Sequence, residues 1–248
     1  MVTRQEREPG LVVFDIDGTL TDTVALHQAA FLRALQSFDF PSLNSDWSSY
    51  RHHTDSGIFA DAWQAAGRQG PGPADQLDFS ARLDHEFRQL QPMQAIREIP
   101  GAAAFVALLR DKGWSVGFAT GGLRALARLK LEHAGIPFDE DTLVTASEHL
   151  TREEIVGATI VAMANDHAGS PGTPVSVGDG LWDLATAQNL GLGFLGVGTG
   201  SKAQLLTERG ATVVADFADQ SRALELIVAM AGRAGFPASG AIDAPVVP

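Results

Sequence analysis

Residues 11–23 read LVVFDIDGTLTDT, and this stretch decides what kind of fold the chain forms. The apolar run at its start is typical of a short buried strand, and Gly18 then turns the chain at once. Asp15 and Asp17 are two residues apart, so an extended backbone points both carboxylates to the same face. The sequence therefore predicts a pair of acids at the carboxyl edge of a parallel sheet, where open α/β sheets build their sites.

Short apolar runs alternate with helical patterns along most of the chain, which is typical of a parallel, doubly wound sheet with helices on both faces. The runs that we predict as strands are residues 11–17, 115–120, 142–147, 175–179, 193–197 and 211–215. The helical patterns between them cover residues 102–112, 123–134, 152–165, 181–189 and 202–209. We expect an α/β fold with a Rossmann-like core formed by residues 10–23 and 100–232.

One long segment interrupts this alternation. Residues 24–99 show helical periodicity, for example in Phe31 and Leu35, and no convincing strand pattern. The sequence GRQGPGP at residues 67–73 indicates a loop between two helices. We therefore predict a helical domain inserted over residues 24–99. Residues 233–248 are rich in Gly, Ala and Pro, and we predict a flexible tail there.

Composition limits the classes of partner. The 248 residues carry a formal net charge of −12 without any cluster of Lys or Arg, so neither nucleic acid nor a membrane surface is an expected partner. The chain has no Cys, which excludes disulfides and thiolate metal sites. We find no pattern of a signal peptide and no run of ~18 apolar residues. We expect a cytoplasmic protein that is a monomer or a homodimer.

Residues 14–20, FDIDGTL, resemble the first motif of the haloacid dehalogenase-like superfamily, whose members are mostly phosphatases and phosphomutases. The resemblance implies that Asp15 is a nucleophile that becomes an aspartyl-phosphate, and that Asp17 is its general acid and base. The whole pattern is similar to that of phosphoglycolate phosphatase-like members, in which a helical cap of the C1 type is inserted after the first strand. Residues 24–99 would then be this cap, which closes over the site.

Residues 116–122, VGFATGG, resemble the second motif of the same family. A Thr at a strand end followed by two Gly offers a hydroxyl and an open backbone to a phosphate. The resemblance implies that Thr120 and Gly121 bind the phosphoryl group of the substrate. By itself the stretch is also compatible with an ordinary turn between a strand and a helix.

Residues 175–183, VSVGDGLWD, resemble the fourth motif. The resemblance implies that Asp179 and Asp183 hold a metal ion together with Asp15 and the main-chain carbonyl of Asp17. A pocket with oxygen ligands alone suits Mg²⁺, which we expect as the cofactor.

The third motif departs from the family pattern, which has a Lys between the second and fourth motifs. No Lys occurs between residues 142 and 178. Thr151 and Glu154 have the spacing of a capping box, so a helix should start here with Arg152 at its first position. A cation opposes the helix dipole at that position, so a bound phosphate accounts for Arg152 better than helix stability does. We predict that Arg152 replaces the usual lysine; the alternative is a solvated surface arginine.

Residues 50–57, YRHHTDSG, form a polar cluster between two helical stretches of the inserted segment. In relatives with a C1 cap, a loop in this region selects the leaving group. We predict that Arg51, His52 and His53 contact an anionic or hydroxylated substrate, with exposure to solvent as the alternative.

These motifs together predict a Mg²⁺-dependent phosphatase that hydrolyses a small phosphorylated metabolite through an aspartyl-phosphate. A phosphomutase remains an alternative, because it shares both acids of the first motif. A non-catalytic binding or regulatory protein with the same fold is the second alternative, and the missing lysine is its main support. A dehalogenase is disfavoured, because the resembling dehalogenases lack the second acid, which is present here as Asp17.

Overall fold

The computed structural model describes residues 10–50, 52–166 and 172–232. Within them, a six-stranded parallel sheet has the strand order β3-β2-β1-β4-β5-β6. Its strands are β1 (Leu11–Phe14), β2 (Ser115–Thr120), β3 (Leu143–Thr145), β4 (Val175–Gly178), β5 (Gly193–Val197) and β6 (Thr212–Val214). This order is that of a doubly wound Rossmann-like fold, so the predicted fold class is confirmed.

Four strands are shorter than the sequence predicts, namely those expected over 11–17, 142–147, 175–179 and 211–215. The reason is clearest for β1. Asp15 still donates its N–H to the carbonyl of Val177 in β4, at 2.9 Å, but the backbone then turns. The carbonyl of Ile16 accepts from the N–H groups of Leu20 and Thr21 at 2.9 and 3.0 Å. These turn hydrogen bonds replace the sheet pairing and place Asp15 and Asp17 just beyond the strand.

Helices cover both faces of the sheet, because alternate residues of β1 point to opposite sides. Leu11 and Val13 belong to the hydrophobic cluster that includes α6 (Arg152–Asp166). Val12 and Phe14 belong to the cluster that includes α4 (Ala102–Asp111) and α9 (Gln220–Ala231). The remaining helices of this part are α5 (Arg124–His133), α7 (Leu181–Asn189) and α8 (Gly200–Glu208), with the short 3₁₀ helix η3 (Glu140–Thr142).

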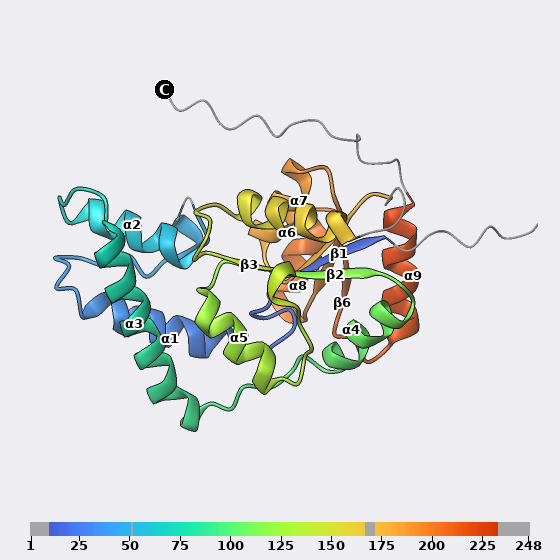
Figure 1. The fold of residues 1–248 in the computed structure, drawn as a ribbon, viewed down its shortest axis with the longest axis horizontal. Coiled ribbons are helices and arrows are strands. Elements are labelled where there is room, and N and C mark those ends of the chain that lie inside the picture. The colour runs from blue at the N-terminus through green and yellow to red at the C-terminus, as the bar shows by residue number, and fades with distance from the viewer. Residues whose placement is uncertain (1–9, 51, 167–171, 233–248) are drawn as a thin grey trace, which may run out of the picture.

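Residues 24–99 form helices and loops between β1 and α4. The helices are α1 (Val24–Gln36), α2 (Asp55–Ala65) and α3 (Pro73–Leu90), with the short 3₁₀ helices η1 (Trp47–Ser49) and η2 (Gln91–Met93). Figure 1 shows α1, α2 and α3 gathered at one end of the molecule, with α4 and α9 at the other. The chain leaves and re-enters the core side by side, because Asp22 N–H donates to the carbonyl of Arg97 at 2.9 Å and Ile99 N–H to that of Leu20 at 2.8 Å.

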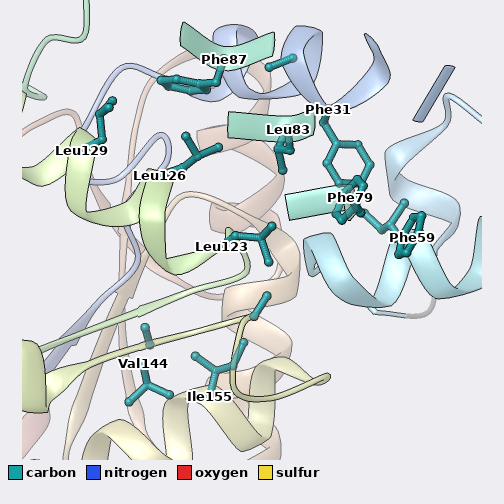
Figure 2. Packing of buried hydrophobic residues seen from close by; sticks show 14 of the residues in the cluster. Phe31, Phe59, Phe79, Leu83, Phe87, Leu123, Leu126, Leu129, Val144 and Ile155 are labelled. Atoms are coloured by element: carbon teal, nitrogen blue, oxygen red, sulfur yellow. The ribbon is translucent and has the colours of Figure 1, made fainter. Parts of the chain in front are cut away.

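A continuous hydrophobic cluster joins this helical segment to the core (Figure 2). Phe59 and Phe79 stack with ring centroids 4.3 Å apart, and Phe31 meets Phe79 edge to face at 5.5 Å. The cluster continues through Leu126 of α5 to Ile155 of α6. Burial of these side chains fixes the helical segment against the carboxyl edge of the sheet, and so forms one wall of the site described below.

In the described part of the chain, every helix is too short or too polar to span a membrane. The predicted flexible tail, residues 233–248, lies outside the described residues.

Candidate active site

The candidate site lies beyond the carboxyl ends of β1 and β4, the two neighbours at which the strand order reverses. Doubly wound sheets bind ligands at this switch point. Asp15 follows β1, Asp179 follows β4, and Thr120 ends β2. Arg152 is the first residue of α6 and reaches the same place with its side chain. Four separate stretches of sequence therefore meet at one edge of the sheet.

Two glycines allow this close approach. Gly18 has a φ of +82°, a conformation that favours glycine, and a Cβ there would collide with the carboxylate of Asp179. Gly121 lies against the main-chain carbonyl of His53, and a Cβ there would collide with that oxygen. The loop after β1 and the loop after β2 can therefore close around the site only with glycine at these positions.

Three buried carboxylates form a candidate cation site. Asp15, Asp179 and Asp183 each offer an oxygen within 4.8 Å of the others. Burial, together with the neighbouring charges of Asp179 and Asp17, raises the pKa of Asp15 to about 6 against the lowering by Arg152. Burial also raises the pKa values of Asp179 and Asp183. Oδ1 of Asp179 is buried and has no hydrogen-bond partner among the described residues. This unpaired oxygen and the crowded charges fit a divalent cation.

Arg152 pairs with two of these acids. Its Nη1 lies 2.9 Å from Oδ1 of Asp15 and 3.4 Å from Oδ1 of Asp183, and its Nε donates to the carbonyl of His53 at 3.1 Å. Burial disfavours the charge of Arg152, but the two carboxylates outweigh burial and raise its pKa. The predicted capping box is present, since Glu154 N–H donates to Thr151 Oγ1 at 3.2 Å and Thr151 N–H to Glu154 Oε2 at 3.0 Å. The side chain of Arg152 is 11% exposed and lies in the site rather than solvated at the surface.

Asp17 is held by contacts that the sequence did not reveal. Lys130, a fully buried residue of α5, places Nζ 2.6 Å from Oδ2 of Asp17, and Thr23 Oγ1 donates to Oδ1 at 2.5 Å. Burial opposes ionisation of Asp17, but the charge of Lys130 and these hydrogen bonds lower its pKa to about 2. Asp17 is therefore a carboxylate in this structure.

Lys130 also connects Asp17 to the helical segment. Its Nζ lies 3.0 Å from Nδ1 of His27, and Nε2 of His27 lies 2.9 Å from Oδ1 of Asp55. Since an ammonium group only donates, Nδ1 of His27 accepts, and its Nε2–H donates to Asp55. Asp55 also accepts from Leu123 N–H at 3.1 Å. A second missed lysine, Lys202 at the start of α8, pairs with Oδ2 of Asp179 at 2.9 Å.

A cavity of about 120 Å³ opens over the site between the core and the helical segment. Asp15, Asp17, Thr120, Gly121 and Arg152 line it from the core side. Oγ1 of Thr120 accepts from Gly122 N–H at 3.1 Å. A carboxylate, a hydroxyl and a guanidinium thus face one space of a size that takes a phosphoryl group, which is the chemistry needed for phosphoryl transfer.

The three residues of the loop 50–57 that we predict to contact substrate do not all lie in this cavity. His53 lines the cavity with Asp15, and its ring stacks on Trp182 with centroids 4.9 Å apart. His52 lies outside this cavity and lines a neighbouring one of about 590 Å³ with His53 and Lys202. Arg51 lies outside the described residues.

The chain was compared with known proteins. The family model described as haloacid dehalogenase-like hydrolase matches residues 9–191. A curated relative, the probable phosphatase IndB of Dickeya dadantii (strain 3937), is 28% identical over 191 residues, which make up 75% of this chain and 80% of that protein.

Solved structures share the fold. A hydrolase from Pseudomonas syringae superposes with a TM-score of 0.68 at 22% identity, covering 88% of this chain and 99% of the other. A putative β-phosphoglucomutase from Bacteroides vulgatus superposes with a TM-score of 0.67 at 17% identity, covering 91% of both chains. At these identities the likeness establishes the architecture alone.

Proposed function

The chain belongs to the haloacid dehalogenase-like hydrolases, and on this premise we propose that it is a Mg²⁺-dependent phosphatase of a small phosphorylated metabolite. The observation that carries the proposal is the position of Asp15. This buried carboxylate faces the cavity beside Arg152 and lies close to Asp179 and Asp183 of the candidate cation site, with Asp17 two residues further along the chain. We propose that residues 24–99 act as the cap that covers the bound substrate.

Asp15 acts as the nucleophile. One of its carboxylate oxygens forms a bond to phosphorus while the bond from phosphorus to the leaving alkoxide breaks, and the enzyme becomes an aspartyl-phosphate. In the second step a water oxygen bonds to phosphorus, the bond to Asp15 breaks, and inorganic phosphate leaves. Two easier displacements replace one direct attack of water on an anionic ester.

Asp17 moves the proton in both steps. It protonates the leaving alkoxide and then accepts a proton from the attacking water. Its contacts with Lys130 and Thr23 favour the carboxylate, which is the form that the second step needs. The first step therefore requires Asp17 to turn away from Lys130 and to take up a proton before the substrate reacts.

Thr120, Gly121 and Arg152 bind the transferred group. The Thr120 hydroxyl and the main-chain N–H of Gly121 hold phosphoryl oxygens, and the guanidinium of Arg152 neutralises their charge. Arg152 thereby takes the place of the lysine that the family usually has. His53, which lines the cavity, would act on the leaving-group side.

Mg²⁺ fits the acidic cluster, with Asp15, Asp179, Asp183 and the main-chain carbonyl of Asp17 as the residues that would hold it. When bound, the ion neutralises charge on the phosphate and on the three carboxylates. Without an ion, Arg152 and Lys202 are the cations that pair with these acids within the described residues.

Mg²⁺ should therefore raise the thermal stability of the protein. At a concentration 100 times its Kd it adds about 2.7 kcal/mol, or roughly 5–10 °C in Tm for a chain of this size. Because the pKa values of the three acids are raised, protons compete with the ion at low pH, so the shift should be larger at pH 8 than at pH 5. Differential scanning fluorimetry with and without Mg²⁺ measures this shift in Tm at the two pH values.

Asp179→Asn should remove most of this shift, whereas Asp78→Asn, on the exposed face of α3, should leave it unchanged. An equal Mg²⁺ shift in Asp179→Asn and in the wild type would show that the ion binds elsewhere.

The proposed activity is tested with p-nitrophenyl phosphate. We expect release of p-nitrophenol in the presence of Mg²⁺ and its loss after chelation of the ion with EDTA. Absence of metal-dependent hydrolysis of this ester and of a panel of phosphorylated metabolites would contradict the proposal and favour the non-catalytic alternative.

The phosphomutase alternative shares Asp15 and Asp17 and differs only in what attacks the aspartyl-phosphate. A phosphatase releases inorganic phosphate in equal amount to the alcohol, whereas a mutase passes the phosphoryl group to another hydroxyl. Phosphate release measured beside substrate consumption separates the two.

A further inference from the structure

The cavity over Asp15 extends toward the helical segment, where apolar side chains line it beside polar ones such as Gln28 and Thr54. Val24 and Phe31 of α1, Trp47 of η1 and Ile58 of α2 line this side, and we call these four residues the apolar wall. A leaving group attached to a phosphate bound at Asp15 would extend toward this wall. Binding sites lined in this way favour apolar ligand surface.

Two aromatic rings also line the cavity. Trp182, at the start of α7, lines it with its ring stacked on that of His53 at an interplanar angle of 25°. Aromatic faces pack well against planar rings. The cavity of about 120 Å³ also takes the phosphoryl group, and an apolar cavity that holds one benzene measures roughly 150 Å³. The space left for the leaving group is therefore no larger than one ring.

Among the described residues that line the cavity, none offers an unpaired positive charge to a substrate that carries an anionic group besides its phosphate. Arg152 is paired with Asp15 and Asp183 at the phosphate end. Both ring nitrogens of His27 are engaged, by Lys130 and Asp55. Burial, with the nearby charge of Arg152, lowers the pKa of His53 and disfavours its cation at neutral pH.

Negative charge, by contrast, is already present. Asp17 and Asp55 both line the cavity, one toward the phosphate site and the other at the start of α2. Lys130 and His27, the partners of these two acids, are thereby engaged. A carboxylate or second phosphate on the substrate would lose its water there without a cation to pair with it, which disfavours binding.

We propose that the substrate is the phosphate ester of an alcohol that carries one apolar, ring-sized group and no second anionic group. This inference rests on the proposed phosphatase function and gives it a substrate class. From the loop 50–57 the sequence predicts contacts to an anionic or hydroxylated substrate. The lining of the cavity favours instead a leaving group without charge. Phosphorylated carboxylic acids and bisphosphates fall outside the class.

Three esters test the proposal on the full-length protein with Mg²⁺: benzyl phosphate, 4-carboxybenzyl phosphate and ethyl phosphate. The first two differ by one carboxylate, and the first and third by the ring. We expect kcat/KM for benzyl phosphate to exceed that for ethyl phosphate by about 30-fold, because the ring buries apolar surface. It should exceed that for 4-carboxybenzyl phosphate by a similar factor, because the carboxylate meets like charge.

Two tryptophan variants assign the preference to the apolar wall. Trp47→Ala should lower the ratio of kcat/KM between benzyl and ethyl phosphate about 10-fold, mainly through KM for the benzyl ester. Trp63→Ala is the matched control, because Trp63 packs on Phe38 and Phe59 away from the cavity. For Trp63→Ala the ratio of kcat/KM between benzyl and ethyl phosphate should equal that of the wild type, even if this variant is less stable.

The outcomes separate the two proposals. Equal or faster hydrolysis of 4-carboxybenzyl phosphate or 2-phosphoglycolate than of benzyl phosphate overturns the substrate class and leaves the phosphatase function standing. Hydrolysis of none of these esters, nor of p-nitrophenyl phosphate, overturns the phosphatase function and the substrate class with it.

Discussion

Asp15→Asn should lower kcat for phosphate ester hydrolysis by at least about 10⁴-fold, because loss of a covalent nucleophile removes the reaction path and leaves only binding and electrostatic effects. The amide is close in shape to the carboxylate and keeps the cavity, so substrate binding should change far less than kcat. The measurement is steady-state hydrolysis with saturating Mg²⁺, and binding of inorganic phosphate is followed separately by calorimetry.

The same variant should remain folded, and the pH dependence of its Tm provides the control. Asp15 has a pKa of about 6 in the folded protein against 3.8 as the reference value, so the folded state binds more protons between these pH values. In EDTA, the stability due to this group is full below pH 4 and is lost as pH rises through 6. Asp15→Asn should therefore raise Tm relative to wild type above pH 6, and the difference should shrink toward pH 4. An unfolded variant would make its inactivity uninformative, whereas an active one would contradict the mechanism.

Arg152→Met should lower kcat/KM by about 10³-fold, because it removes the charge that holds the phosphoryl oxygens beside Asp15. It also leaves Asp15 and Asp183 without their buried cation, so the metal-free protein should lose about 3–5 kcal/mol of unfolding free energy. Activity is therefore measured well below the Tm of the variant, with Mg²⁺ present. Steady-state kinetics and urea unfolding are the two readouts.

Arg152→Lys is the informative comparison for Arg152→Met. It restores a point charge of the kind that the family usually has and omits the fork-shaped donor pair, so we expect recovery to within roughly 30-fold of wild type. Arg128→Met is the control, because Arg128 pairs with Glu140 on the surface and should affect neither activity nor stability. A kcat/KM within threefold of wild type for Arg152→Met would remove Arg152 from the proposed machinery.

The position of Arg152 could be predicted because its signals are local. A capping box fixes where α6 begins, and the carboxyl edge of a parallel sheet fixes where that helix start lies. Asp15 and Asp179 follow from the same rule, since each comes directly after a buried apolar run. The position of the site therefore depends on short patterns that a single sequence contains.

The contacts of Asp17 could not be predicted in the same way. Lys130 meets it across 113 residues of chain, and no spacing rule connects the two. One signal was available: Lys130 lies four residues after Leu126 on the buried face of α5, and a buried lysine needs an acidic partner. The identity of that partner depends on how α5 packs against the loop after β1. The contacts of His27 and Asp55 depend on how the helical segment packs against the core.

The position of Lys202 near the site could have been predicted from the sequence. It lies at the start of α8, directly after β5, so the rule that places Asp179 at the carboxyl edge also places Lys202 there. The lysine of the third motif is expected within residues 142–178, and neither Lys130 nor Lys202 lies there. Two of the three lysines of the chain contact acids of the site from outside that interval.

The most direct test of the mechanism is to trap the aspartyl-phosphate. The protein is mixed with ³²P-labelled benzyl phosphate and Mg²⁺, quenched in acid within milliseconds and digested. We predict a hydroxylamine-sensitive label on the peptide that contains Asp15, formed and lost at rates compatible with turnover, and absent in Asp15→Asn. Rapid hydrolysis without any label on that peptide, or a label on another residue, would contradict Asp15 as the nucleophile.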